Sequence, residues 1–129
     1  MQRTNYSSGA QWEGSVGYSR AVKAGNVIEV SGTVAVDEAG NLIGEGDVYA
    51  QAKFILQKIE TVLQQAGATL ADVVRTRMFV TDISQSEAIG RAHGEAFAAI
   101  KPCTSMIEIK SLIRPEYLIE IEATAILSP

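Results

Sequence analysis

Apolar residues recur at steps of three and four along residues 48–66, in the stretch "VYAQAKFILQKIETVLQQA". This spacing places the apolar side chains on one face of an α-helix. Asp47 can cap the start of the helix, and Gly67 can end it. The pattern therefore predicts a first amphipathic helix between these two residues.

A second helical stripe follows the sequence Ser84-Gln85-Ser86-Glu87. This run has the S-x-x-E form of a capping box, so we expect it to open the helix. The helix should extend to about Ile100, because Pro102 biases the residue before it away from helical geometry.

The remaining apolar positions alternate with polar ones, which is typical of β-strands. Two strands are expected between Tyr18 and Val36, with a turn at Ala24-Gly25-Asn26, and Leu42-Ile43 can add a short strand. Further strands are predicted in "VVRTRMFVTD" and in the ranges 104–109 and 118–127; in the first of these, Val74, Thr76, Met78 and Val80 share one face.

This order of elements predicts an α+β domain with one sheet and two helices on one face of it. The last strand would bury Ile119, Ile121, Ala123, Ala125 and Leu127. Its other face would carry glutamates together with Leu118 and Ile126. Such a mixed face predicts a partly buried interface, and hence a homo-oligomer.

The composition fits a single folded domain over residues 1–129, with 47% hydrophobic and 20% charged residues. A net charge of −4 argues against nucleic-acid binding. No apolar run is long enough to span a membrane, and the first residues lack the apolar core of a secretory signal. Residues 1–17 are expected to form an irregular arm, anchored by Trp12.

The chain has one cysteine and one histidine. A single cysteine cannot form an internal disulfide, so we expect a reducing, cytoplasmic location. A structural zinc site usually needs four Cys or His ligands, so none is expected. The sequence predicts neither a metal nor a cofactor.

Glu120 and Glu122 would project from one strand face about 7 Å apart. Paired carboxylates can act as acid and base when their surroundings differ. They can equally form a solvated face with Arg75 and Arg77 as cross-strand partners, and spacing alone favours this second interpretation.

Other residues allow both a functional and a structural interpretation. Tyr18 and Arg20 can form a ligand-binding pair or a surface packing pair. His93 can be a general base, although a packing role is favoured. Arg91 and Glu95, four residues apart, should pair on the helix surface.

Ser31 and Gly32 interrupt a strand rich in β-branched residues. Glycine within a strand often marks a bulge or a close backbone approach, and backbone N–H groups here can bind an anion. Cys103 is interpreted as a small structural residue.

The chain resembles the RidA/YjgF family, also called endoribonuclease L-PSP, from Val16 to Leu127. The segments that carry the resemblance are "VGYSRAVKAGNVIEVSG", "QAKFILQKIETVLQQAGATLADVVRTRMFVTDI" and "IEIKSLIRPEYLIEIEATAI". The resemblance implies a chorismate-mutase-like fold with one mixed sheet and two helices on one face. It also implies a homotrimer with a central β-barrel and ligand clefts between subunits.

The best-understood activity of this family is hydrolysis of enamine or imine intermediates. The resemblance implies a catalytic Glu120 that positions water, with Tyr18, Ser31 and Gly32 in the cleft. The family arginine that binds the substrate carboxylate matches Thr104, which has one short donor and no charge. Arg20 or Arg91 are candidates for a replacement cation, and Arg114 is a third.

Two functions are therefore expected from the sequence. The first is a hydrolase or deaminase of enamine/imine-type metabolites whose specificity is altered at Thr104. The alternative is a non-catalytic ligand-sensing or chaperone-like binding protein. The ribonuclease label of the family is not favoured, because the chain is acidic and has no basic stripe with interleaved aromatic residues.

Overall fold

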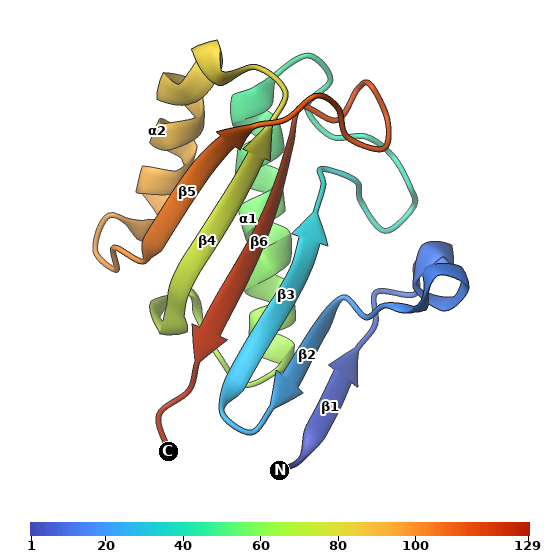
Figure 1. The fold of residues 1–129 in the computed structure, drawn as a ribbon, viewed down its shortest axis with the longest axis vertical. Helices are drawn as coiled ribbons and strands as arrows, with labels where there is room; N and C mark the ends of the chain where they lie inside the picture. The colour runs from blue at the N-terminus through green and yellow to red at the C-terminus, as the bar shows by residue number, and fades with distance from the viewer.

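The computed structural model describes residues 1–129, which form one six-stranded sheet with two main helices behind it (Figure 1). The strands are β1 (Arg3–Tyr6), β2 (Ala21–Ala24), β3 (Val27–Thr33), β4 (Val73–Val80), β5 (Cys103–Glu108) and β6 (Ile119–Ile126). They lie in the order β1-β2-β3-β6-β4-β5. Only β4 and β5 are parallel, so the sheet is mixed.

The helices are α1 (Val48–Gln65) and α2 (Ser86–Phe97). Both lie on the same side of the sheet in Figure 1, and they pack against each other. Short helical turns are η1 (Glu13–Gly17), η2 (Leu70–Asp72) and η3 (Ile83–Gln85). The predicted α+β fold, with two helices on one sheet face, is confirmed.

The N-terminal cap of α1 is the predicted residue, whereas the predicted N-terminal cap of α2 is wrong. The Asp47 side chain accepts a hydrogen bond from the N–H of Ala50 at 3.0 Å. Ser84 does not open α2. It lies within η3, where the Asp82 carboxylate accepts from both its N–H at 3.0 Å and its hydroxyl at 2.6 Å. Asp82 therefore holds the turn that precedes α2.

The core lies between the sheet and the helices. Alternate residues of β6 enter it, because a strand presents every second side chain to the same face. Ile119, Ile121, Ala123 and Ala125 are buried, as predicted, whereas Leu127 is only half-buried. The other face of the sheet carries the polar and charged residues that the sequence analysis assigned to it.

The N-terminal segment differs from its prediction. Residues 1–17, expected to be an irregular arm, contain the edge strand β1, which pairs antiparallel with β2. Trp12 does not anchor the segment, since 58% of its surface is exposed. The buried residue of this segment is Glu13, whose carboxylate accepts hydrogen bonds from the N–H and the hydroxyl of Ser8 at 3.0 and 2.6 Å.

The ladder is irregular at two points. The register between β4 and β6 shifts between Val73 and Arg75, so Val73 is buried and Val74 is exposed, and Val74 does not share the buried face of Thr76, Met78 and Val80 as predicted. The register between β3 and β6 shifts between Val30 and Thr33, as the Ser31-Gly32 pair predicted. The predicted short strand near Leu42 is a single bridge to Val36.

Candidate functional site

The bulge in β3 brings the backbone of Gly32 against the side chain of Glu120 on β6. A Cβ atom at Gly32 would lie 2.7 Å from both Cδ and Oε2 of Glu120. Real Cβ atoms do not approach other atoms so closely, so any larger residue at position 32 would make the end of the Glu120 side chain move. The absence of a side chain at Gly32 thus gives the carboxylate the space that it occupies.

Arg20 lies beside the same bulge. Its guanidinium donates to the carbonyl oxygen of Gly32 at 2.6 Å, and it lies 5.9 Å from the centre of the Tyr18 ring. The Ser31 hydroxyl donates to the carbonyl of Ser19 at 2.6 Å and ties β3 to the segment before β2. The structure therefore brings together Tyr18, Arg20, Ser31, Gly32 and Glu120.

The two glutamates of β6 have different surroundings. Glu122 forms an ion pair with Arg77 at 2.7 Å, as the solvated interpretation predicted, whereas Glu120 forms no ion pair. Burial raises the pKa of Glu120, and the charge of Glu122 raises it further, while Arg20 lowers it. A carboxylate with a raised pKa is better suited to accept and return a proton near neutral pH.

Thr104 lies elsewhere, on the edge strand β5. Its hydroxyl accepts a hydrogen bond from the Thr76 hydroxyl at 2.8 Å, and Thr76 lies 2.8 Å from Nε2 of His93. His93 is half-buried and stacks on Phe97, with ring centres 4.7 Å apart. Thr104 therefore contacts the helix side of the sheet, and Glu120 lies on the opposite face.

Arg91 also lies apart from Glu120. It stacks on the ring of Tyr49 at 4.3 Å, so it does not pair with Glu95 as predicted. Glu95 instead binds Lys53 at 3.1 Å and accepts a hydrogen bond from the Tyr49 hydroxyl. Within one chain, Thr104 and Arg91 are therefore separated from the Gly32–Glu120 group.

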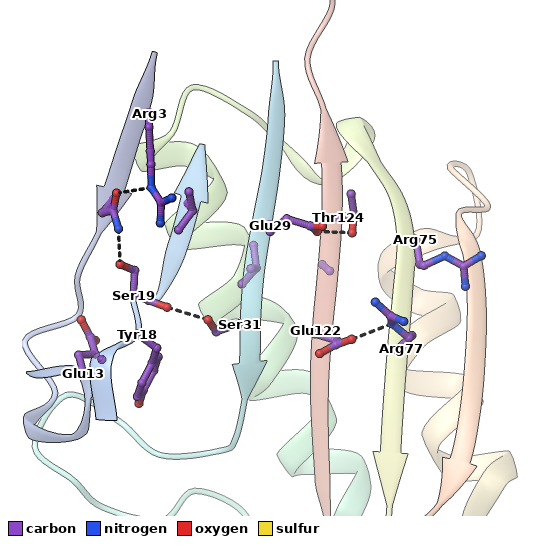
Figure 2. Close-up of a pocket in the computed structure, with 15 residues that line it drawn as sticks. Arg3, Glu13, Tyr18, Ser19, Glu29, Ser31, Arg75, Arg77, Glu122 and Thr124 are labelled. Atoms are coloured by element: carbon purple, nitrogen blue, oxygen red, sulfur yellow. Dashed lines mark hydrogen bonds and ion pairs between the residues drawn. The ribbon is translucent and has the colours of Figure 1, made fainter. Parts of the chain in front are cut away.

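Two hollows border the Tyr18–Arg20 segment. The larger, about 580 Å³, runs along the open face of the sheet from Tyr18 and Ser31 to Arg75 and Arg77 (Figure 2). The smaller, about 380 Å³, lies between β3, α1 and the N-terminal segment, and Arg20 lines it together with Lys58.

Lys58 is a feature that the sequence analysis missed. Its ammonium donates to the carbonyls of Val34 and Val36 at 3.1 and 2.7 Å and so holds the chain after β3. Burial lowers the pKa of Lys58 to about 8, and Arg20 contributes to this shift. Glu13 was missed as well, because nothing in its local sequence signals burial of a carboxylate.

No cluster of three or more His, Cys, Asp or Glu residues in the structure could hold a metal ion. No helix has the length and hydrophobicity needed to cross a membrane.

A mixed six-stranded sheet with two helices on one face and a bulged β3 beside β6 defines a YjgF-type α+β protein. The family model described as Endoribonuclease L-PSP matches residues 10–127. The chain belongs to this family, the RidA/YjgF family.

Relatives of known structure or name agree with this assignment. The crystal structure of Rv2704 from Mycobacterium tuberculosis, a YjgF/YER057c/UK114 family member, is 48% identical, with a TM-score of 0.89, and covers 98% of this chain and 100% of its own. Protein SCO2049 of Streptomyces coelicolor is 35% identical over 92% of this chain and 87% of its own. The 3-aminoacrylate deaminase RutC of Acinetobacter baylyi is 33% identical over 84% of this chain and 85% of its own.

Proposed function

We propose that this chain hydrolyses small enamine or imine metabolites to a carbonyl compound and ammonia. The observation that carries the proposal is Glu120, a half-buried carboxylate with a raised pKa that rests against the bulge at Gly32. The similarity to a protein named 3-aminoacrylate deaminase supports this reaction class. We further propose that the working form is a homotrimer, because the Glu120 and Thr104 regions can form one cleft only between copies.

The reaction needs one group that moves protons. Water adds to the carbon of the protonated imine while one of its protons passes to Glu120, which gives a carbinolamine. Glu120 returns this proton to the nitrogen, the C–N bond breaks with release of ammonia, and the hydroxyl proton passes to the ammonia through Glu120 as the carbonyl forms. One water is consumed and one ammonium ion is released. Arg20 donates to the Gly32 carbonyl, and the Gly32 backbone lies against Glu120.

Thr104 distinguishes the proposed site from the arginine-bearing pattern. A guanidinium binds a carboxylate through two charge-assisted hydrogen bonds, each worth about 1.5–3 kcal/mol. The Thr104 hydroxyl offers one neutral donor. We therefore propose that the chain belongs to a subgroup without the carboxylate-binding arginine and that its preferred substrate differs accordingly.

The test is hydrolysis of 2-iminopropionate and 3-aminoacrylate by the purified protein. Glu120→Gln should lower kcat at least about 100-fold, the usual contribution of a positioned acid–base group. Glu45→Gln is the matched control, because Glu45 is exposed in a loop and makes no hydrogen bond or ion pair. Equal activity of the Glu120→Gln protein and the wild type would contradict the proposed role.

The alternative is a binding protein without catalysis, and the uncharged Thr104 favours it over a deaminase of ordinary efficiency. Thr104→Arg separates the two functions. With Glu120 competent for catalysis, the arginine should raise kcat/KM for 2-iminopropionate at least about tenfold, as one added charge-assisted hydrogen bond predicts. If neither the wild type nor this variant turns over these substrates or the imine of pyruvamide, the non-catalytic function is the correct one.

A further inference from the structure

We propose that Thr76 and His93 are positioning residues that make the Thr104 hydroxyl an oriented hydrogen-bond donor for an uncharged carbonyl oxygen of the ligand. The ligand's location rests on the proposed function, whereas the hydrogen-bond chain itself does not. The chain runs from a half-buried imidazole on α2, through a buried hydroxyl on β4, to an exposed hydroxyl on the edge strand β5.

Strand register places the two hydroxyls side by side. Thr76 and Thr104 are direct partners in the parallel β4–β5 ladder, with 2.8 Å between their oxygens. Thr76 is 0% exposed and has no access to water, so its hydroxyl depends on Thr104 and His93 for all of its hydrogen bonds.

The direction of this hydrogen-bond chain is part of the proposal, and the position of each proton follows once Thr76 is the donor to Thr104. A hydroxyl has one proton, and Thr76 donates it to Thr104. The Thr76 oxygen can then only accept from His93, so Nε2 of His93 must carry a proton. Because burial lowers the pKa of His93, the ring is neutral at neutral pH and its proton lies on Nε2 rather than on Nδ1.

At its exposed end, the hydrogen-bond chain then presents a donor and not an acceptor. One lone pair of the Thr104 oxygen is engaged by Thr76, and the proton of Thr104 is free to point outward. Hydrogen bonds in a chain polarise one another, by about 10–30% per bond, which strengthens this last donor. The result is one strong, uncharged donor at the position of the family arginine.

A single neutral donor suits a different ligand from that of an arginine. A carboxylate taken out of water needs a compensating charge, and Thr104 and Thr76 supply none. A ketone, ester or amide oxygen is uncharged and requires only the one hydrogen bond that Thr104 offers. The ligand class is therefore a small enamine or imine with a neutral carbonyl group beside the reacting carbon.

Because the protein has a single histidine, the tautomer at the start of the hydrogen-bond chain can be measured directly. In protein with ¹⁵N-labelled histidine, NMR at pH 7.5 should show the Nε2–H tautomer. Thr76→Val, which removes the hydroxyl and keeps the shape, should release this preference, and Thr76→Ser should restore it. Thr61→Val is the matched control, because Thr61 is exposed on α1 and its hydroxyl donates only to the Gln57 carbonyl of the same helix. A dominant Nδ1–H tautomer in the wild type would overturn the proposed direction.

The ligand class is tested with pyruvamide and pyruvate as a neutral and a charged probe, by calorimetric titration. Pyruvamide should bind the wild type more tightly than pyruvate. Thr104→Val and Thr76→Val should each weaken pyruvamide about tenfold, whereas Thr104→Ser should not, since one net hydrogen bond is lost only in the valine variants. Thr104→Arg should reverse the preference.

Equal binding of the two probes by the wild type, or no binding of pyruvamide, would overturn the ligand class. Failure of the proposed function would give a different result. In that case pyruvamide binds with the expected preference, the Nε2–H tautomer is present, and no enamine or imine is hydrolysed.

Discussion

The β3–β6 region and the β4–β5 region of the same sheet carry opposite kinds of polar chemistry. Around the bulge of β3, Arg20 and Glu120 are charged groups partly removed from water. Glu120 lies on the open face of the sheet, and Arg20 lines the hollow between β3 and α1. Beneath α2, Thr76, His93 and Thr104 are uncharged at neutral pH and are joined by hydrogen bonds on the helix side.

The difference shows how one small domain can hold both halves of a site. The charged half needs a nearby compensating charge, and Arg20 lies close enough to lower the pKa of Glu120. The uncharged half needs only that every hydroxyl has a partner, which the β4–β5 register provides. The group proposed to transfer protons is thus charged, whereas the three hydrogen-bonded side chains on the helix side of β4 and β5 are not.

The largest effect should come from removing the space at the bulge. In Gly32→Ala, the new Cβ would lie 2.7 Å from the Glu120 carboxylate, which must then move. Because the carboxylate ends a flexible side chain that can shift, we expect a loss of about 1 kcal/mol in the free energy of unfolding, the lower end for overpacked sites, measured by urea denaturation.

Gly90→Ala is the control for this substitution. Gly90 lies in α2 with nothing within 4 Å of a Cβ atom, so alanine should stabilise the helix by about 0.5–1 kcal/mol. If Gly32→Ala were as stable as the wild type, Glu120 would not be confined by the bulge, and the contrast between the two regions would be weaker.

Much of the fold could be predicted from periodicity. The helix α1 follows from its apolar stripe, and β6 from strict alternation, because both elements bury one face. The strand β1 could not be predicted, since the sequence "RTNY" is polar and mostly exposed and is held by backbone pairing with β2. The exposed Val74 was missed because the bulge after Val73 changes which side chain points inward.

From local pattern, a feature of the site could be predicted only where a single residue type indicates a particular geometry. A glycine within β3 indicated a close approach, and the structure places Glu120 there. Nothing in the spacing linked His93 to Thr76, which lie 17 residues apart on a helix and a strand. Lys58 reaches carbonyls more than 20 residues away, so its depressed pKa depends on tertiary packing that a local pattern does not contain.

A smaller effect should appear in the stability of Glu120→Gln. Because the folded state raises the pKa of Glu120 above 4.5, it binds more protons than the unfolded state between these two values. Stability from this group is therefore present below pH 4.5 and is lost as the pH rises through the folded pKa.

Glutamine stays uncharged, so Glu120→Gln should be more stable than the wild type at pH 7 and similar to it at pH 4. The gain should stay below about 1 kcal/mol, since solvent screens a half-exposed group. Thermal melts of both proteins across pH 4–8 measure it. A variant less stable than the wild type at pH 7 would mean that the charged carboxylate stabilises the fold, contrary to the direction of its pKa shift.

The smallest effect, and the one that separates the two regions most sharply, is the opposite pH dependence at His93. Burial lowers the pKa of His93 below 6.5, so the folded state binds fewer protons than the unfolded state just below that pH. Stability from His93 is present above pH 6.5 and is lost as the pH falls through the folded pKa. His93→Gln, which can still donate to Thr76, should remove this loss and flatten the acid side of the stability curve by less than about 1 kcal/mol.

Replacing Glu120 and His93 should therefore change the pH dependence in opposite directions, because acidification favours the protonated, neutral form of Glu120 and charges His93. If the His93→Gln and wild-type curves run parallel below pH 6.5 in thermal melts, then His93 is as accessible to protons as a histidine in water, and the β4–β5 region is not the uncharged half of the sheet.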